Sequence, residues 1–143
     1  MKNKSSVFKS IPSLKKLCRL MLFLFATGYA SVPPKFKTTE IKFVSEGISL
    51  AGTIFKPDHI QTAVVLVHGS GQENRMTAFA TMLAKSGIAV LTYDKRGVGA
   101  SEGVYAGPEV GTNNIDSQNL SLLSLDASAA VNILSKSLSN DQI

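Results

Sequence analysis

Two short stretches decide the fold of this chain: Ala63-Val-Val-Leu-Val-His-Gly-Ser-Gly71 and Ile88-Ala-Val-Leu-Thr-Tyr-Asp-Lys-Arg-Gly-Val-Gly99. Each begins with a run of apolar, mostly β-branched residues that do not alternate with polar ones. Such runs indicate strands buried on both faces, as in the middle of a parallel sheet. Each run then stops at a polar and glycine-rich segment, which predicts a loop directly after the strand.

The segment between the two strands has the pattern of a helix over residues 74–86. Apolar or small residues that fall on one side of this helix are expected to face the sheet, and Gly87 is suited to end the helix in a left-handed conformation. The side in question consists of Phe79, Met82, Leu83 and Ser86. Strand, helix and strand together predict a βαβ unit with parallel strands.

The flanking sequence extends this pattern in both directions. Apolar residues alternate with polar ones from Thr39 to Lys56, and Glu46-Gly47 interrupts them, which predicts an antiparallel β-hairpin. A polar, glycine-rich loop is expected over residues 95–116, and Asp116 or Ser117 could cap a helix over 118–137. The apolar stripe of that helix contains Leu123, Ala127, Ala130, Leu134 and Leu138. Gln142-Ile143 reads as the beginning of a further strand.

The two strand-loop segments resemble the α/β-hydrolase superfamily, and more narrowly its dienelactone-hydrolase-like and serine-aminopeptidase-like branch. The helix at Leu125-Asp-Ala-Ser-Ala-Ala-Val-Asn-Ile-Leu134 is similar to the helix that precedes the nucleophile strand of that family. The resemblance covers residues 39–143. It implies an α/β fold that is the N-terminal half of an α/β hydrolase, a β-hairpin followed by parallel βαβα, truncated before the nucleophile strand. It also implies the hydrolysis of an ester, lactone or peptide bond by a serine nucleophile.

The glycine turn after the first buried strand is the candidate oxyanion site. A sharp turn at that position exposes backbone N–H groups, which can stabilise a developing negative charge. The resemblance implies that the N–H of Ser70 or Gly71 is one of two such donors. The alternative is that the turn is purely structural.

The neighbouring polar residues are expected to shape the loops rather than to react. The resemblance makes His68 and Gly69 structural parts of the oxyanion turn, because the catalytic histidine of the family comes near the C-terminus of the fold. Asp94, Arg96 and Gly97 are expected to fix the long loop near the site. His59 lies in a turn between strands and is expected to be a solvated loop residue.

No catalytic residue is assigned within the chain. Gly99-Ala-Ser-Glu-Gly103 matches the G-x-S-x-G pattern of a nucleophile elbow. That elbow places its serine on a strand-to-helix turn, whereas Ser101 follows its strand by seven residues and no helix opens behind it. The resemblance places the real elbow after the strand that begins near Ile143, with the acid and base further on.

The N-terminal residues have the features of an export signal. Residues 1–30 carry six Lys/Arg and no Asp/Glu, followed by the short apolar run Leu20–Ala26 and small residues at Gly28 and Ala30. This order predicts a signal peptide over 1–30, cleaved near Ala30, a linker over 31–38 and an exported domain over 39–143. The alternative is an N-terminal membrane anchor, although a spanning helix needs about 20 apolar residues.

Composition limits the other classes of function. The formal net charge of +5 arises in the leader, since residues 31–143 carry nine Lys/Arg against ten Asp/Glu. We therefore expect no nucleic-acid partner and contact with membranes only through the leader. Cys18 is the only cysteine and lies in the leader, and the only histidines are His59 and His68, without metal-ligand spacing, so no metal site is expected. No cofactor is expected either. Two functions stay open: part of a serine hydrolase for a small-molecule ester or a peptide, here an inactive fragment, or a non-catalytic exported binding module.

Overall fold

The structure is a computed structural model that describes residues 35–111 and 115–139. The predicted signal peptide with its cleavage site near Ala30, and the strand expected to begin near Gln142, lie outside these residues. No helix within the described ranges is both long and apolar enough to cross a bilayer.

Four strands form one mixed sheet, as the sequence predicted. The strands are β1 (Phe36–Ser45), β2 (Ile48–Pro57), β3 (Thr62–Leu66) and β4 (Ile88–Tyr93), and the helices are α2 (Thr77–Ala84) and α3 (Ser117–Ser139). The strand order is β1-β2-β4-β3. β1 pairs antiparallel with β2, β2 antiparallel with β4, and β3 parallel with β4. A β-hairpin followed by parallel βαβα is therefore confirmed.

The hairpin turn is formed by two residues in left-handed conformations. Glu46 has a φ of 48° and Gly47 a φ of 74°, and this kind of two-residue turn matches the twist of the flanking strands. The hairpin is longer than the sequence indicated, because β1 begins at Phe36, within the stretch predicted to be a linker. The centres of the Phe36 and Phe55 rings lie 5.9 Å apart, and this contact stabilises the additional residues of β1 in the strand.

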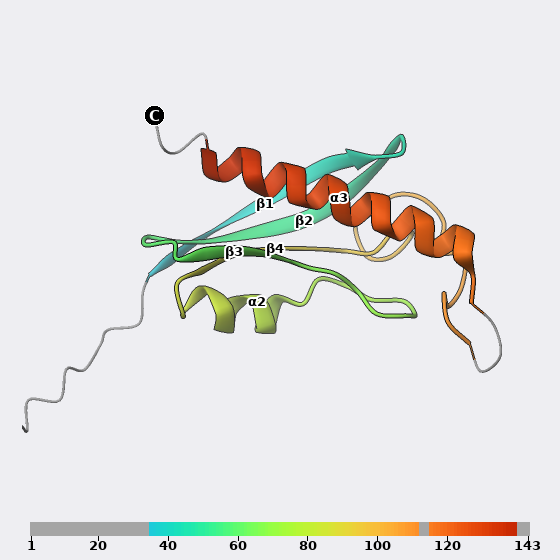
Figure 1. Cartoon of the computed structure of the whole chain (residues 1–143), viewed down its shortest axis with the longest axis horizontal. Helices are drawn as coiled ribbons and strands as arrows, with labels where there is room; N and C mark the ends of the chain where they lie inside the picture. Colours follow the sequence, from blue (N-terminus) through green and yellow to red (C-terminus); the bar gives the residue numbers. More distant parts are fainter. Residues whose placement is uncertain (1–34, 112–114, 140–143) are drawn as a thin grey trace, which may run out of the picture. The chain divides into compact units, whose positions relative to one another are not determined.

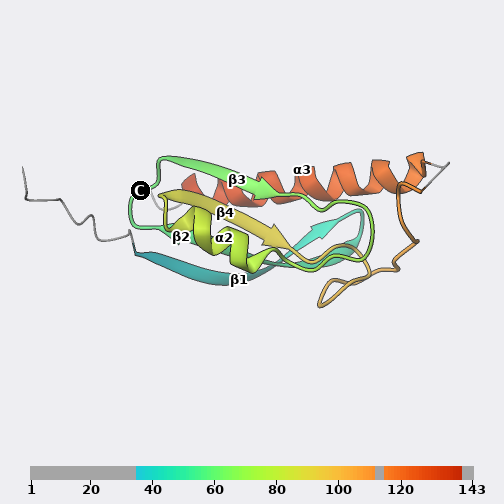
Figure 2. The same cartoon turned by 90° about the horizontal axis from the view of Figure 1, so that it is seen from below.

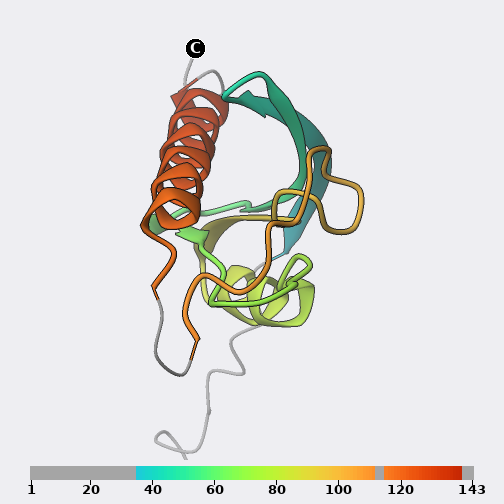
Figure 3. The same cartoon turned by 90° about the vertical axis from the view of Figure 1, so that its right-hand side faces the viewer.

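The two helices cover opposite faces of the sheet, with α3 on one side and α2 on the other (Figures 1 and 3). Ala130 and Leu134 of α3 pack in a cluster on one face with Phe43, Leu50, Ile54, Leu91 and Tyr93. Ala80 and Ala84 of α2 pack on the other face with Phe55 and Val90. The sheet thus lies between two helical layers. Figure 2 looks at the sheet from the α2 side, so that α2 is drawn in front of the strands.

The buried face of α2 differs from the predicted one. Phe79 and Met82 are exposed by 47% and 55%, whereas Ala80 and Ala84 are fully buried. Alanines four residues apart bring the helix close to β2 and β4, so the short side chains rather than the large ones face the sheet. The helix is also shorter than the predicted 74–86. Gly87 follows it with the expected left-handed φ of 81°.

β3 is only half-buried, although its apolar run predicted burial on both faces. Among the described strands β3 has a neighbour on one side alone, so its other edge is open. A groove of about 340 Å³ follows this edge, between β3 and α3. Its apolar lining is formed by Ala63, Val64, Val65, Val131, Leu134 and Leu138.

A buried ion pair joins α3 to the end of β4. Arg96 donates from Nη2 to Oδ1 of Asp126 at 2.6 Å and from Nε to Oδ2 at 3.2 Å, and it also contacts the Ser45 carbonyl at 3.4 Å. The Asp126 side chain is fully buried and that of Arg96 is 8% exposed. Arg96 was expected to fix the long loop near the site, and its partner Asp126 on α3 was not predicted. The signal was present, because Asp126 lies on the apolar stripe, between Leu123 and Ala130.

We predict that Asp126→Ala strongly destabilises the domain, because it leaves the Arg96 guanidinium buried without its partner. The loss should be about 3–5 kcal/mol in the free energy of unfolding, measured by urea denaturation. Ser128→Ala, an exposed change on the same helix, should stay within about 0.5 kcal/mol of the original protein. The double change of Arg96→Met with Asp126→Leu should recover much of the loss. An Asp126→Ala variant as stable as the Ser128→Ala control would contradict this account.

Candidate functional site

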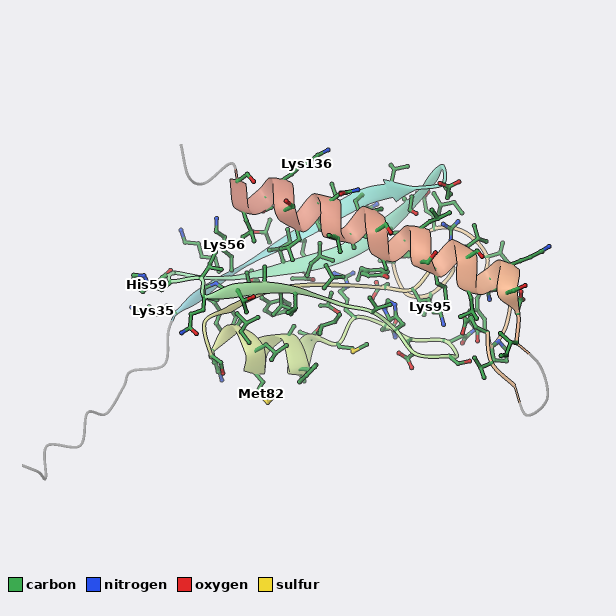
Figure 4. The ribbon with its side chains drawn as sticks, viewed as in Figure 1. Lys35, Lys56, His59, Met82, Lys95 and Lys136 are labelled. Atoms are coloured by element: carbon green, nitrogen blue, oxygen red, sulfur yellow. The ribbon has the colours of Figure 1, made fainter. Side chains whose placement is uncertain are left out.

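The candidate oxyanion turn and the loop after β4 meet because their strands are parallel. Leu66 of β3 pairs with Thr92 of β4, so both strands end at the same edge of the sheet. The turn Gly69–Gly71 follows the first strand, and Asp94, Lys95 and Arg96 follow the second. Figure 4 shows Lys95 at this end of the sheet, away from Lys35, Lys56 and His59 at the other end. Two segments that are distant in sequence are thereby brought to one edge.

The ring of His68 is held by the backbone of β4. Nε2 lies 2.5 Å from the carbonyl oxygen of Tyr93, and the two rings meet edge to face at 4.7 Å. A carbonyl only accepts hydrogen bonds, so Nε2 carries the proton and donates it. Burial lowers the pKa of His68, and the bond to Tyr93 and the nearby Glu73 carboxylate offset only part of that effect. This geometry fits the structural role expected for His68.

The three N–H groups of the turn are used differently. The N–H of Gly69 donates to the Glu73 carboxylate at 3.2 Å, and that of Gly71 donates to the Glu109 carboxylate at 3.1 Å. Within the described part of the chain, the N–H of Ser70 makes no hydrogen bond. The Gly69 carbonyl accepts from Lys95 at 2.9 Å. Since the peptide between Gly69 and Ser70 is trans, the Ser70 N–H points away from Lys95.

A buried Lys95–Glu109 ion pair holds the turn through hydrogen bonds to its backbone. Nζ of Lys95 lies 2.6 Å from Oε1 of Glu109, and both side chains are at most 2% exposed. The same Nζ donates to the carbonyls of Gly69 and Gly71, at 2.9 and 2.7 Å. Burial alone would raise the pKa of Glu109, but hydrogen bonds from Lys95 and the Gly71 N–H outweigh it and hold the pKa below its ordinary value. Neither residue was predicted from the sequence, and only the position of Lys95 directly after a buried strand could have indicated one of them.

Asp94 holds both the loop that follows β3 and the loop that follows β4. Its carboxylate accepts from the Arg75 guanidinium at 2.9 and 3.1 Å and from the backbone N–H groups of Arg75 and Ala100 at 3.0 Å. Burial would raise the pKa of Asp94, but these donors lower it overall. Arg75 also contacts Glu40 of β1, which ties the hairpin to the same network. These contacts fit the loop-fixing role expected for Asp94.

The glycines of the loop after β4 are required by space as well as by φ. Gly97 has a φ of 71°, and a Cβ there would overlap the backbone of Tyr105. Gly99 has a φ of 58°, and a Cβ there would press against Asn74 and the Asp94 carboxylate. The loop therefore folds back closely on itself, which a side chain at either position would prevent.

The side chain of Ser101 is buried and bonded to the backbone. Its hydroxyl donates to the Asp94 carbonyl at 2.6 Å and accepts from the Ala51 N–H at 3.0 Å, and the residue is buried. These bonds tie the loop to β2. Residues 102–111, which follow it, contain no helix. The G-x-S-x-G match thus lacks the strand-to-helix setting of a nucleophile elbow.

The remaining sequence candidates lie elsewhere. His59 is exposed in the turn between β2 and β3, at the opposite end of the sheet from the oxyanion turn (Figure 4). In residues 35–111 and 115–139 no three His, Cys, Asp or Glu side chains gather closely enough to hold a metal ion.

The comparison with solved structures gives the class of fold. A hypothetical protein from Pseudomonas aeruginosa matches 71% of this chain at a TM-score of 0.50 and 23% identity, over 31% of its own length. An esterase from Pyrococcus furiosus matches 71% of this chain at 0.49 and 24% identity, over 37% of its length. An α/β hydrolase from Penicillium sp. sh18 matches 47% at 0.41 and 27% identity, over 24% of its length. The chain therefore spans about a quarter to a third of the proteins it matches.

The strand order, the parallel βαβ unit and the turn after β3 agree with the N-terminal part of the α/β-hydrolase fold that the sequence predicted. The profile of the family described as "Serine aminopeptidase, S33" matches residues 58–141, more than half of the chain, and the chain belongs to this hydrolase family. A comparison with curated proteins gives no match.

We predict that His68 makes the stability of the domain fall as the pH decreases below about pH 6.5. The pKa of His68 is lowered in the folded protein, so the unfolded chain binds a proton first as pH falls. Stability is then fully present above about pH 6.5 and is lost as pH falls below it. Urea denaturation above and below this pH should show the loss in the original protein and in His59→Gln. It should be absent in His68→Gln, and a slope that persists there would contradict the assignment.

A second loss should follow at lower pH, from the carboxylates of Asp94 and Glu109. Both have pKa values lowered in the folded state, so their contribution is present above the ordinary carboxyl range and disappears as pH falls through the folded values. The same denaturation series, continued below pH 4.5, measures this loss.

Proposed function

We propose that this chain supplies the oxyanion-stabilising part of a serine hydrolase that cleaves an ester, lactone or peptide bond. The observation that carries the proposal is the Ser70 N–H, which makes no bond within the described residues while its neighbours Gly69 and Gly71 are both held by carboxylates. Membership of the hydrolase family supports it. No cofactor is part of the proposal.

We assign the nucleophile not to Ser101 but to a serine on the strand-to-helix turn that the family resemblance implies. Its Oγ adds to the carbonyl carbon of the substrate, its proton passes to a histidine base, and the carbonyl oxygen becomes an oxyanion. The Ser70 N–H donates to that oxygen, and a second donor comes from the residue after the nucleophile. His68 and Lys95 hold the turn in position from the sheet side and do not touch the substrate. The chain alone is then inactive, because an oxyanion site without a nucleophile cannot form an acyl-enzyme.

The proposal includes export. The basic residues of 1–30, the apolar run and the small residues near Ala30 support a cleaved leader and a periplasmic or extracellular mature chain. N-terminal sequencing of the secreted protein should find Ser31 as its first residue. Recovery of the protein in the membrane fraction with Met1 retained would favour the N-terminal anchor instead.

The alternative function is a non-catalytic exported module, and the groove beside β3 favours it. An open strand edge next to apolar side chains is suited to pairing with a further strand, here from a second copy of the chain. Val131→Lys places a charge at a groove position that is 54% exposed, and Leu125→Lys places one on the same helix outside the groove. Light scattering that shows association abolished by Val131→Lys alone would support this module. A monomer in all variants would exclude pairing between copies.

We predict that a fluorophosphonate probe does not label the 143-residue chain and that small activated esters are not hydrolysed above the buffer rate. The reason is that Ser101 is buried and its hydroxyl is bonded to the backbone of Asp94 and Ala51. Mass spectrometry of the intact protein after incubation measures the labelling, with an active serine esterase as the positive control. Stoichiometric labelling that disappears in Ser101→Ala would overturn both the prediction and the dismissal of the G-x-S-x-G match.

A further inference from the structure

The carboxylate of Glu109 is bound as a ligand would be. Oε2 accepts from the Gly71 N–H at 3.1 Å, while Oε1 meets Lys95 at 2.6 Å and the amide nitrogen of Asn119 at 3.4 Å. These donors come from the turn after β3, the end of β4 and the beginning of α3. The set combines one cation with backbone and amide N–H groups, which is the chemistry that binds a carboxylate tightly.

The loop that carries Glu109 is held in place by further hydrogen bonds of its backbone. The Ser70 hydroxyl donates to the Val110 carbonyl at 3.3 Å and accepts from the Val110 N–H at 3.2 Å. The Glu109 carbonyl accepts from the Asp116 N–H at 2.8 Å, and Val110 forms an isolated bridge with Ile115. The segment around Glu109 therefore lies against the oxyanion turn through backbone as well as side chain.

We propose that the Gly71 N–H, Lys95 and Asn119 form a carboxylate-binding site that Glu109 fills from within the chain. The Glu109 carboxylate occupies the Gly71 N–H, so that this group does not bind another anion. The two oxyanion candidates, the N–H groups of Ser70 and Gly71, therefore have different roles. Gly71 anchors the turn to Glu109, and Ser70 is left for the substrate oxygen. The second role rests on the proposed function, whereas the binding site does not.

Removing the side chain of Glu109 opens the site for a free carboxylate. In Glu109→Ala the missing atoms are a methylene and a carboxylate, which acetate replaces in size and charge. The variant also leaves Lys95 buried without an anion, so acetate that binds there restores a lost pairing. A ligand that binds the folded state alone raises the melting temperature, and the stabilisation grows with the logarithm of one plus the ratio of the ligand concentration to Kd.

The experiment compares thermal unfolding of the full 143-residue chain in about 200 mM sodium acetate and in sodium chloride of equal ionic strength at pH 7. The melting temperature of Glu109→Ala should rise by roughly 5 °C in acetate relative to chloride. The original protein should not respond. Neither should Glu73→Ala, which removes the other carboxylate that contacts the turn, from a more exposed position.

A Glu109→Ala chain that fails to fold in chloride remains informative. Acetate should then restore folding, measured by circular dichroism, and chloride should not. The double change of Lys95→Met with Glu109→Leu removes both charges and should fold without any response to acetate. Equal responses of Glu109→Ala and the double variant, or none in Glu109→Ala, would overturn the site. Either result leaves the fluorophosphonate experiment, and with it the proposed function, to be judged separately.

Discussion

The parallel pairing of β3 with β4 is the constraint on which the rest of the site depends. Because the strands run in the same direction, the turn after Leu66 and the loop after Tyr93 leave the sheet at one edge. Several contacts of the candidate site cross between these two exits: His68 to the Tyr93 carbonyl, Lys95 to the carbonyls of Gly69 and Gly71, and Arg75 to Asp94. A one-residue shift in this register would turn every side chain of the shifted strand to the opposite face.

Two buried ion pairs hold the loops in place. Each of their charged groups would be costly to bury without a partner of opposite charge. Lys95 with Glu109 and Arg96 with Asp126 are both almost fully buried, and each joins the end of β4 to a segment at least ten residues further along the chain. A buried pair adds little net stability over an apolar pair of the same shape, but removing one partner is strongly unfavourable. We therefore regard these pairs as devices that select one arrangement of the long loop, in a protein whose apolar contacts supply most of the stability.

The elements that follow from local sequence pattern were predictable from the sequence. Residues whose positions depend on a contact with a distant part of the chain were not. The apolar run Ile88–Tyr93, the Glu46-Gly47 turn and the Ala130–Leu134 face of α3 were predictable from periodicity and turn chemistry. The inward face of α2 was not, because the close approach to the sheet selected Ala80 over Phe79. Glu109 was not predictable either, since it lies in a loop without periodicity and its partner Lys95 is 14 positions earlier in the chain.

Amide hydrogen exchange at the oxyanion turn tests the central claim most directly. The account holds that the turn is preformed, with the Gly71 N–H bonded to the buried Glu109 carboxylate and the Ser70 N–H without a partner among the described residues. Residue-resolved exchange measured by NMR should therefore show a protected Gly71 amide beside a rapidly exchanging Ser70 amide. Protection of Ser70, or rapid exchange of both amides in the folded chain, would contradict the account.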